Sequence, residues 1–451
     1  MRIILLSGGS GQRLWPWSSG ARTKVFLRLL NDDSGAPQSM LERICNQLEQ
    51  AGLLQTAAIV THASQIELTR QHSGGKLAIW SEPHKRGTFH AIALAAASLY
   101  TAGAAGGEET VCVLPADMYA EQPFLSLLRQ LPDALAQSGA ELALIGCSPD
   151  HPSTQYGYIV PQQTKTCPAY SRVSRFTEKP DKTRAAALIA EGALWNCGVF
   201  AFRLGYMLQL MKERGLPLNP EQLLQRYAKL STLSFDEEVA EHCSHAIVLR
   251  YTRAWKDLGS WSALTSEIGQ RQIGAGSISA DSPGTWLVNE LACPVHVIDV
   301  PEIIVAASAA GVLVASRENA DRIKQLHPVA DAVTWMEEKR WGHMRTLDYS
   351  RSASGSECWT RKVSMTACAS TSYHLHRSRH TIWTVVSGRG RFFCQGQQHN
   401  VEPGTVLDIP PGMPHGMCSG TTALEWIEVQ LGERLLEDDK HELARECLEQ
   451  T

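Results

Sequence analysis

The stretch that decides the fold is LLSGGSGQRLWPWSSGARTKVF, residues 5–26, in which a short apolar segment leads into a loop with three glycines in four positions. Because glycine has no Cβ, backbone N–H groups in such a loop can approach a phosphate closely, and Arg13 and Lys24 supply cations for the same charge. A P-loop requires Gly-Lys-Ser/Thr where Gln12 and Arg13 stand, and a dinucleotide-binding loop requires glycine in place of Leu14. The loop therefore favours phosphate binding of another kind, and a glycine-rich turn with surface cations is the alternative.

Apolar strand-like segments alternate with helical ones from this loop as far as WKDLGSW, residues 255–261. The strand-like segments are IILLS (3–7), AAIVTH (57–62), TVCVLPAD (110–117) and ELALIGC (141–147). This alternation is typical of βαβ units and predicts an α/β fold with a mostly parallel, Rossmann-like sheet. Its ligand crevice is expected at the carboxyl ends of the strands, where the glycine loop follows the first strand.

The pattern changes twice after this α/β part. From Gly274 short β-rich pieces such as TWLVNE and EIIVAAS predict a small β module of the left-handed β-helix kind. The last third alternates strands such as TIWTVVSG and ALEWIEVQL with Gly/Pro turns, which predicts a β-sandwich or barrel. We therefore expect three domains, at residues 1–268, 269–330 and 338–451.

Composition excludes several classes of protein. The 451 residues are 43% hydrophobic and 20% charged with a net charge of -4, and no basic run marks a nucleic-acid partner. The apolar start MRIILLSGG is too short for a signal peptide or a membrane span. Twelve cysteines without a C-x-x-C pair argue against a zinc ribbon and a disulfide framework. These features predict a cytoplasmic protein with reduced thiols and no membrane or nucleic-acid partner.

The motif GGSGQRL (8–14) with Lys24 resembles the signature of the sugar-phosphate nucleotidyltransferases. Six further segments, in order along the chain, resemble the mannose-1-phosphate guanylyltransferase branch: SEPHKRGTFHAIALAA, VLPAD, STQYGYI, FTEKP, LWNCGVFAF and WKDLGSW. The C-terminal third, from KRWGHM (339–344), resembles the type II mannose-6-phosphate isomerase domain, a cupin, which is fused to the transferase in bifunctional enzymes. The resemblance spans nearly the whole chain, and seven motifs in one order make it specific.

The resemblance implies a transferase that makes GDP-mannose and pyrophosphate from GTP and mannose-1-phosphate, with Mg²⁺ as cofactor and a homodimer as the expected assembly. The reaction brings two anions together, so charge neutralisation and in-line positioning carry most of the catalysis. Lys24 would neutralise the triphosphate, while Asp117 and Asp257 would hold Mg²⁺; an N-cap or turn role is the alternative for each aspartate. The implied nucleotide-binding residues are Gly8, Gly9, Ser10, Gly11, Arg13, Glu82 and Arg86, and Arg13 is also expected to be catalytic.

The resemblance places the sugar phosphate against Gly157, Glu178, Lys179 and Asn196. Glu178 can accept hydrogen bonds from two hydroxyls, Lys179 can meet the phosphate, and Asn196 offers both a donor and an acceptor. The alternative for Glu178 and Lys179 is a solvated charge pair, but the proline that follows restricts the backbone and favours a binding role.

Two departures from the family pattern lie near the nucleotide. Thr23-Lys24-Val25 stands where the family usually has Pro-Lys-Gln, and Gly87-Thr88-Phe89-His90 stands where it has Asn-Thr-Ala-Pro. The sequence therefore predicts the type of reaction, and a different sugar or base is the alternative to mannose and guanine.

The C-terminal segment YHLHRSRHTIWTVVSG, residues 373–388, predicts a metal site. His374 and His376 are two apart on a strand and so point to the same face, and His415 could return from a later strand. The spacing resembles the cupin pattern H-x-H-x4-E-x6-G, with Thr381 at the glutamate position and Gly388 at its end. Three imidazoles would prefer Zn²⁺, Co²⁺ or Ni²⁺ and leave a position open for substrate or water.

Isomerisation of mannose-6-phosphate and fructose-6-phosphate is the second activity that the resemblance implies. Arg379 and Lys362 match residues of the isomerase family, and either could bind a sugar phosphate. The alternative is a degenerate cupin that serves as a non-catalytic binding or oligomerisation module.

Overall fold

The computed structural model describes residues 1–9, 11–19, 22–162, 169–326, 334–433, 435 and 439–444. The chain divides into two compact units: Met1–Gly11 with Lys24–Gly269, and Gln12–Thr23 with Gln270–Thr451. The glycine loop therefore contributes its first glycines to one unit, whereas Arg13 belongs to the other. Within the described residues, no helix combines the length and hydropathy needed to cross a membrane.

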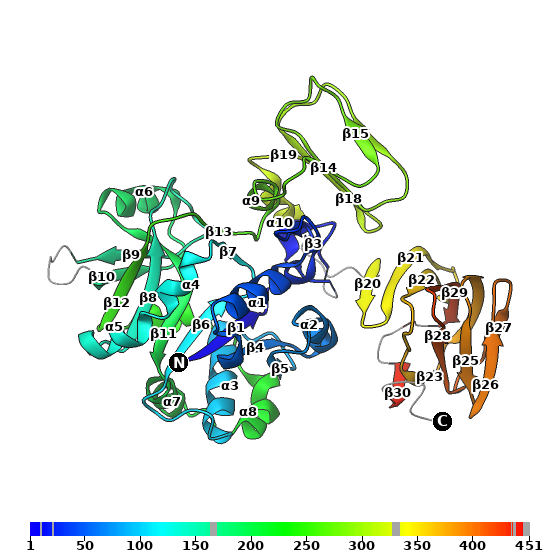
Figure 1. Ribbon diagram of the computed structural model, residues 1–451, viewed down its shortest axis with the longest axis horizontal. Coiled ribbons are helices and arrows are strands. Elements are labelled where there is room, and N and C mark those ends of the chain that lie inside the picture. Colours follow the sequence, from blue (N-terminus) through cyan, green and yellow to red (C-terminus); the bar gives the residue numbers. More distant parts are fainter. Residues whose placement is uncertain are drawn as a thin grey trace. The chain divides into compact units, whose positions relative to one another are not determined.

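A nine-stranded sheet forms the centre of the first unit, in the order β5-β4-β1-β6-β11-β8-β12-β10-β9 (Figure 1). Its strands are β1 (Arg2–Ser7), β4 (Ala57–His62), β5 (Ala78–Glu82), β6 (Thr110–Pro115), β8 (Leu142–Cys147), β9 (Tyr158–Pro161), β10 (Ser171–Thr177), β11 (Leu194–Arg203) and β12 (Ala246–Tyr251). Strands β5, β4, β1 and β6 run parallel, as do β8 and β12, while β11 lies antiparallel between β6 and β8. The predicted Rossmann-like α/β fold is confirmed, and the sheet is mixed.

Helices cover this sheet because its central strands are apolar on both faces. Ten of the fourteen residues of α3 (Thr88–Thr101) are buried, and five of these are alanines, which let the helix approach its neighbours closely. The other helices of the unit are α1 (Met40–Gln50), α2 (Ile66–His72), α4 (Pro123–Leu128), α5 (Leu131–Ser138), α6 (Lys182–Ala190), α7 (Leu204–Glu213), α8 (Pro220–Arg226) and α9 (Trp261–Thr265).

Three short elements complete the edge of the sheet where the parallel strands end. Lys24 begins a 3-10 turn, η2 (Lys24–Phe26), and a π-helical turn, η6 (Asp236–Ala240), precedes β12. A two-stranded sheet pairs β7 (Met118–Ala120) with β13 (Trp255–Asp257), and it places Asp257 opposite Met118. Since Asp117 directly precedes β7, this small sheet brings together two aspartates that are far apart in the sequence.

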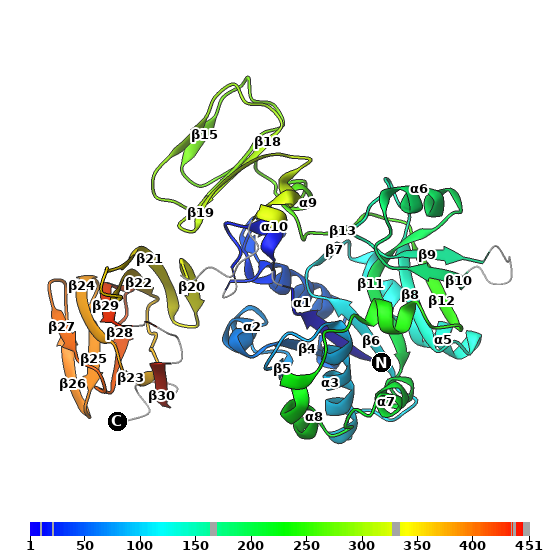
Figure 2. The same cartoon turned by 180° about the vertical axis from the view of Figure 1, so that it is seen from behind.

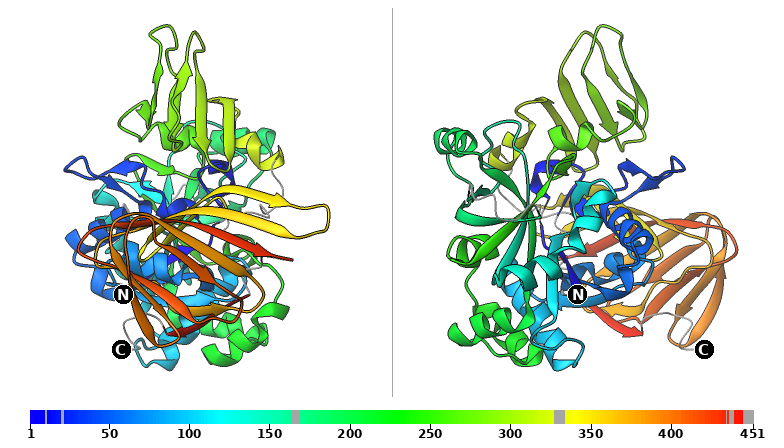
Figure 3. Two further views of the ribbon diagram at one scale, coloured as in Figure 1. Left: turned by 90° about the vertical axis from the view of Figure 1, so that its right-hand side faces the viewer. Right: turned by 60° about the vertical axis from the view of Figure 1, so that its left-hand side comes forward.

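The second unit begins with a module of short parallel strands, which lie side by side in Figure 3. Strands β14 (Gln272–Ile273), β16 (Trp286–Asn289) and β18 (Ile303–Ser308) pair in parallel, as do β15 (Gly276–Ile278) and β17 (Val295–Val297). Strand β19 (Gly311–Ser316) lies antiparallel to β18, and α10 (Ile323–Leu326) follows. The indole of Trp17 donates to the carbonyl of Ala307 at 3.1 Å, so the segment after the glycine loop is anchored on this module.

The C-terminal part consists of two antiparallel sheets, which Figure 2 shows from behind. One contains β20 (Met336–Lys339), β21 (Gly342–Arg351), β22 (Glu357–Met365), β29 (Leu424–Gly432), β24 (His380–Ser387) and β27 (Val406–Ile409). The other contains β26 (Gln397–Val401), β25 (Gly390–Cys394), β28 (His415–Ser419), β23 (Tyr373–His376) and β30 (Lys440–Ala444). Their buried faces share one apolar core that includes Val363, Trp383, Phe392, Met417 and Trp426. The predicted β-barrel is confirmed, whereas its separation from residues 269–330 as a domain of its own stays a prediction.

Candidate active site

Lys24 lies between two carboxylates in the first unit. Its ammonium forms an ion pair with Asp117 and lies 3.5 Å from Oδ1 of Asp257. Burial alone would lower the pKa of Lys24, but the two carboxylates outweigh burial and hold this pKa well above its ordinary value. The lysine is therefore a fixed positive charge, and the structure brings together all three of these predicted residues.

The same pair of aspartates suits a divalent cation. The Lys24 ammonium shows that one cation can meet both carboxylates, and carboxylate oxygens are the ligands that Mg²⁺ prefers. Both side chains line a cavity, so waters and a phosphate could supply the remaining ligands. The donor set of Asp117 and Asp257 thus fits the predicted magnesium.

A cavity of about 350 Å³ opens beside this cluster. Its wall includes Gly8 and Gly9 after β1, Lys24, Glu82 at the end of β5, Lys85 and the start of α3. The hydroxyl of Tyr227 donates to Oε2 of Glu82 at 2.9 Å, and burial raises the pKa of Glu82. A cavity lined by a bare glycine loop, two lysines and one oriented carboxylate has the chemistry of a nucleotide site.

A second cavity, of about 170 Å³, adjoins the first and shares Pro115, Asp117, Gly198 and Asp236 with it. The four residues predicted for the sugar phosphate all line this second cavity: Gly157, Glu178, Lys179 and Asn196. Asp257 lines it as well. Two substrates in these cavities would therefore meet beside the pair of aspartates.

Glu178 is a nearly buried charge of the second cavity, with 7% of its side chain exposed. One of its oxygens pairs with Lys179, and Oε2 has no hydrogen-bond partner within the described part of the chain. Burial and the neighbouring Asp236 raise the pKa of Glu178 to about 7. A Cβ on Gly157 would lie 2.6 Å from this buried Oε2, so only glycine fits beside the oxygen without moving it.

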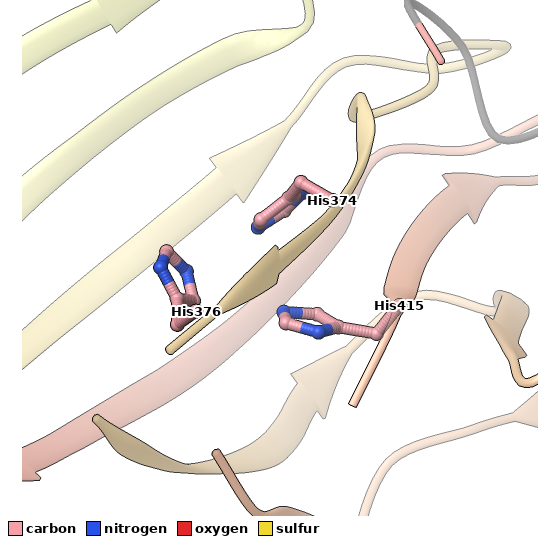
Figure 4. A group of neighbouring side chains, drawn as sticks. All are labelled: His374, His376 and His415. Atoms are coloured by element: carbon pink, nitrogen blue, oxygen red, sulfur yellow. The ribbon is translucent and has the colours of Figure 1, made fainter. Parts of the chain in front are cut away.

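Three histidines converge inside the C-terminal barrel (Figure 4). His374 on β23 pairs directly with His415 on β28, and His376 lies two residues further on the same face. One ring nitrogen of each can be chosen so that all three lie within 4.8 Å of one another. The spacing predicted from the sequence is therefore present in three dimensions.

Hydrogen bonds and burial prepare these histidines to bind a metal. Nδ1–H of His374 donates to the carbonyl of Ser372 and Nδ1–H of His415 to that of Met413, both at 2.8 Å, which leaves each Nε2 as the ligand atom. Burial lowers the pKa of His376 to about 3 and of His415 to about 4, and lowers that of His374 well below its usual value. All three are neutral at physiological pH, which is the form that binds metal.

Two comparisons identify the first unit. Residues 2–271 match the family described as nucleotidyl transferase. Alginate biosynthesis protein AlgA of Pseudomonas aeruginosa is 30% identical over 97% of this chain and 95% of the relative. The chain belongs to this nucleotidyltransferase family. The reaction class predicted from the motifs, nucleotidyl transfer to a sugar phosphate, is thereby confirmed.

Another relative and one solved structure show the same similarity. Mannose-1-phosphate guanylyltransferase of Escherichia coli is 28% identical, with 97% of each chain covered. A crystal structure described as mannose-1-phosphate geranyltransferase from Thermus thermophilus superposes with a TM-score of 0.58 at 27% identity, over 72% of this chain and 98% of that one. Residues 366–438 match the AraC-like ligand binding domain, so the predicted combination of a transferase domain with a cupin domain is confirmed.

Three residues predicted for the nucleotide are not among those that line the large cavity of the nucleotidyltransferase. Arg86 instead donates through its guanidinium to the backbone carbonyls of Tyr227 and Ala228, and its neighbour Lys85 faces the cavity. Arg13 lies in η1 (Gln12–Leu14), within the other compact unit, so its approach to the triphosphate stays a prediction. Gly11 is not among the lining residues, and Ser10 lies outside the described residues.

The structure does not bring Lys362 together with the three histidines, so its role in an isomerase site stays a prediction. Buried and partly exposed residues alternate along β22, so Arg361 and Val363 point into the barrel, and Lys362 points outwards to an ion pair with Glu425. Arg379 does lie inside, 5% exposed, and donates from Nη1 to Gln430 at 2.9 Å and from Nε to Asp439 at 3.0 Å.

The sequence motifs missed two buried charges. Asp236 lines both cavities, yet it lies in a helical turn outside every motif. Glu428 lies inside the barrel, where burial raises its pKa and the charge of Arg361 opposes that shift. The alternation in IEVQL would have placed it on the wrong face, because Ile427, Val429 and Leu431 are the apolar residues there, whereas the structure buries Glu428 and Gln430.

Proposed function

We propose that this nucleotidyltransferase transfers a guanylyl group from GTP to mannose-1-phosphate, which yields GDP-mannose and pyrophosphate. The observation that carries the proposal is the pair of adjoining cavities that meet at Asp117, with Lys24 between Asp117 and Asp257. Mannose as the sugar and guanine as the base are supported by relatives that match nearly the whole chain, such as the mannose-1-phosphate guanylyltransferase of Escherichia coli.

The residues of the chain would act mainly through charge and position. The glycine loop and Lys24 would bind the triphosphate, while Glu178, Lys179 and Asn196 would hold the sugar phosphate, so that its oxygen faces the α-phosphorus. Mg²⁺ held by Asp117 and Asp257 would neutralise phosphate charge. Since the attacking oxygen is already an anion, no side chain has to remove a proton.

Glu82 supports guanine as the base. A carboxylate accepts two hydrogen bonds side by side, and guanine presents two neighbouring donors, N1–H and the 2-amino group, on one edge. Tyr227 orients the Glu82 carboxylate by donating to Oε2. Adenine presents an acceptor at N1, which would face the buried carboxylate without a hydrogen bond, and this disfavours its binding.

The experiment is a panel of five nucleoside triphosphates against several sugar-1-phosphates, with pyrophosphate release as the readout. We expect GTP with mannose-1-phosphate to give the highest kcat/KM, and Glu82→Gln to lower the preference for GTP over ATP by about tenfold or more. Glu108→Gln, which changes an exposed glutamate of the same unit, serves as the control. A higher kcat/KM for another base or sugar would overturn the corresponding part of the proposal.

A metal-dependent isomerase in the cupin is the second candidate function. The observation that favours it is the set of three neutral histidines, two of which have Nδ1 anchored on backbone carbonyls. Isomerisation of mannose-6-phosphate would need a bound metal to polarise the carbonyl and a base to move a proton between adjacent carbons. The test is interconversion of mannose-6-phosphate and fructose-6-phosphate by protein loaded with Zn²⁺, Co²⁺ or Ni²⁺; no interconversion with any of them leaves the cupin as a binding module.

A further inference from the structure

Asp236 lies where the two cavities of the nucleotidyltransferase meet. It is the first residue of η6, and it lines both the larger cavity beside the glycine loop and the smaller one beside Glu178. Its Oδ2 accepts from the hydroxyl of Ser234 at 3.2 Å, and the same hydroxyl accepts from the backbone N–H of Asp236. The carboxylate is therefore held in one orientation at the junction.

The other oxygen of the Asp236 carboxylate fixes the orientation of the Asn196 side-chain amide. Oδ1 of Asp236 accepts from Nδ2 of Asn196 at 3.0 Å, while Oδ1 of Asn196 accepts from the backbone N–H of Gly198 at 3.1 Å. Because a backbone N–H can only donate, this contact assigns the oxygen and nitrogen of the amide unambiguously. One N–H of the amide remains, so the side chain can offer a donor to the cavity.

The charges around Asp236 define the polarity of the smaller cavity. Glu178 and Asp236 lie beside the sugar-phosphate residues, Asp117 and Asp257 are the pair suited to a metal, and Lys179, which pairs with Glu178, is the cation among the lining residues. Carboxylates repel a phosphate and accept hydrogen bonds from hydroxyls. Hydroxyls of a sugar ring can therefore donate to Glu178 and Asp236, while Lys179 is the cation of this cavity that a phosphate can meet.

We propose that Asp236 is a sugar-recognition residue, which fixes the Asn196 amide and accepts a hydroxyl of the sugar ring beside Glu178. This inference rests on the proposed function only in that a sugar-1-phosphate occupies the smaller cavity. The ligand that Asp236 would recognise is a sugar ring with adjacent hydroxyl groups.

The test compares Asp236→Asn and Asp236→Ala with the matched control Glu237→Gln. Glu237 is the next residue of η6 and also acidic, but it is exposed and lines neither cavity. Loss of one hydrogen-bonded acceptor should raise KM for the sugar-1-phosphate about tenfold in Asp236→Asn and leave KM for the nucleotide within about twofold. Asp236→Ala should also lower kcat, since Asn196 is then released, and Glu237→Gln should resemble the wild type.

A pH profile separates recognition from a structural role. The groups that face Glu178 are Lys179, Asp236, Glu237 and Glu241, whose Oε1 accepts from the backbone N–H of Glu178. Removal of the Asp236 charge should let Glu178 ionise more easily, so the acid limb of kcat/KM for the sugar-1-phosphate moves to lower pH by about one unit in Asp236→Asn. A merely structural residue would not move this limb.

Several outcomes would overturn the inference. Equal changes in both KM values, an unmoved acid limb in a folded Asp236→Asn variant, or the same rise in KM for the sugar-1-phosphate in Glu237→Gln would each exclude a role in sugar recognition. The measurements use the best sugar-1-phosphate of the wild-type panel. If the wild type prefers another sugar, the proposed function is overturned, but the role of Asp236 can still be tested with that sugar. If the wild type is active as proposed and Asp236→Asn is unaffected, only the inference about Asp236 is overturned.

Discussion

At the scale of single residues, Lys24 balances two carboxylates that would otherwise repel each other. It contacts Asp117 and lies 3.5 Å from Asp257, and it also lines the larger cavity. Lys24→Met keeps the apolar stem and removes the charge, so we expect kcat to fall about a hundredfold or more. Without Mg²⁺ the melting temperature should also fall, and added Mg²⁺ should restore most of it by neutralising the two aspartates.

The measurements for Lys24 are pyrophosphate release and thermal unfolding with and without Mg²⁺. Lys76→Met, which removes an exposed lysine paired with Glu49 in the same unit, is the control and should change neither quantity substantially. If Mg²⁺ fails to restore the stability of Lys24→Met, the lysine is a packing residue and the two aspartates do not share a metal.

The raised pKa of Glu178 makes the protein less stable as pH rises. Its pKa is raised from 4.5 to about 7, chiefly by burial. Between these values the native state holds a proton that the unfolded chain has released, so the free energy of unfolding falls as pH rises through this window. The loss is at most about 3 kcal/mol above pH 7.

Glu178→Gln has no carboxyl group to ionise and escapes this loss. The melting temperature of the variant relative to wild type should therefore be higher at pH 8 than at pH 5. The exposed Glu191, changed to Gln, provides the control. A difference between variant and wild type that stays constant across this range would contradict the raised pKa of Glu178.

At the scale of elements, the turn before α3 positions the turn that carries Asp236. The backbone N–H of Leu233 donates to the carbonyl of Arg86, that of Phe89 to the carbonyl of Leu233, and that of Phe235 to the hydroxyl of Thr88. Gly87 has φ +85°, and a Cβ there would lie 2.1 Å from the carbonyl oxygen of Leu233. No side chain fits without moving one of the two segments.

Gly87→Ala should therefore lower the free energy of unfolding by about 2 kcal/mol or more and should raise KM for both substrates. Gly103→Ala is the matched control, because Gly103 follows the other end of α3 with φ +62° and no atom lies within 4 Å of its added Cβ. Urea unfolding and steady-state kinetics measure the two effects. Equal destabilisation by both variants would mean that the conformation of the glycine, rather than the contact with Leu233, is what matters.

The elements also show how far sequence reasoning reaches. The alternation of strands and helices predicted the sheet, and the histidine spacing predicted which strand face carries the triad, because both depend on local periodicity. The antiparallel course of β11 and the pairing of β13 with β7 depend on contacts between distant segments, so periodicity could not predict them. The face on which Lys362 lies was equally out of reach, because a shift of one residue along a strand turns a side chain to the opposite face.

At the scale of the whole molecule, the residues that line the two cavities and the three histidines lie in different compact units. The lining residues of both cavities belong to Met1–Gly11 and Lys24–Gly269, whereas the three histidines belong to Gln270–Thr451. Each unit has its own apolar core. A change that only removes the metal site should therefore leave nucleotidyl transfer intact.

His376→Ala tests this independence. The wild type should carry about one equivalent of Zn²⁺, Co²⁺ or Ni²⁺ after loading, and the variant should lose it, since two imidazoles are too few for a stable site. Any metal-dependent isomerisation that the wild type shows should disappear as well, while kcat for nucleotidyl transfer should stay within about twofold. Elemental analysis and both activity assays provide the measurements.

The control for His376→Ala is His380→Ala, which removes a histidine outside the triad and should retain the metal. His380 lies on β24, partly exposed, with its side chain paired to Asp408. Loss of nucleotidyl transfer in a folded His376→Ala protein would show that the two units are coupled. If the wild type takes up no stoichiometric metal at saturating concentrations of these ions, the three histidines do not form a metal site. Three neutral, converging imidazoles already supply every ligand that the sequence predicts for a transition metal.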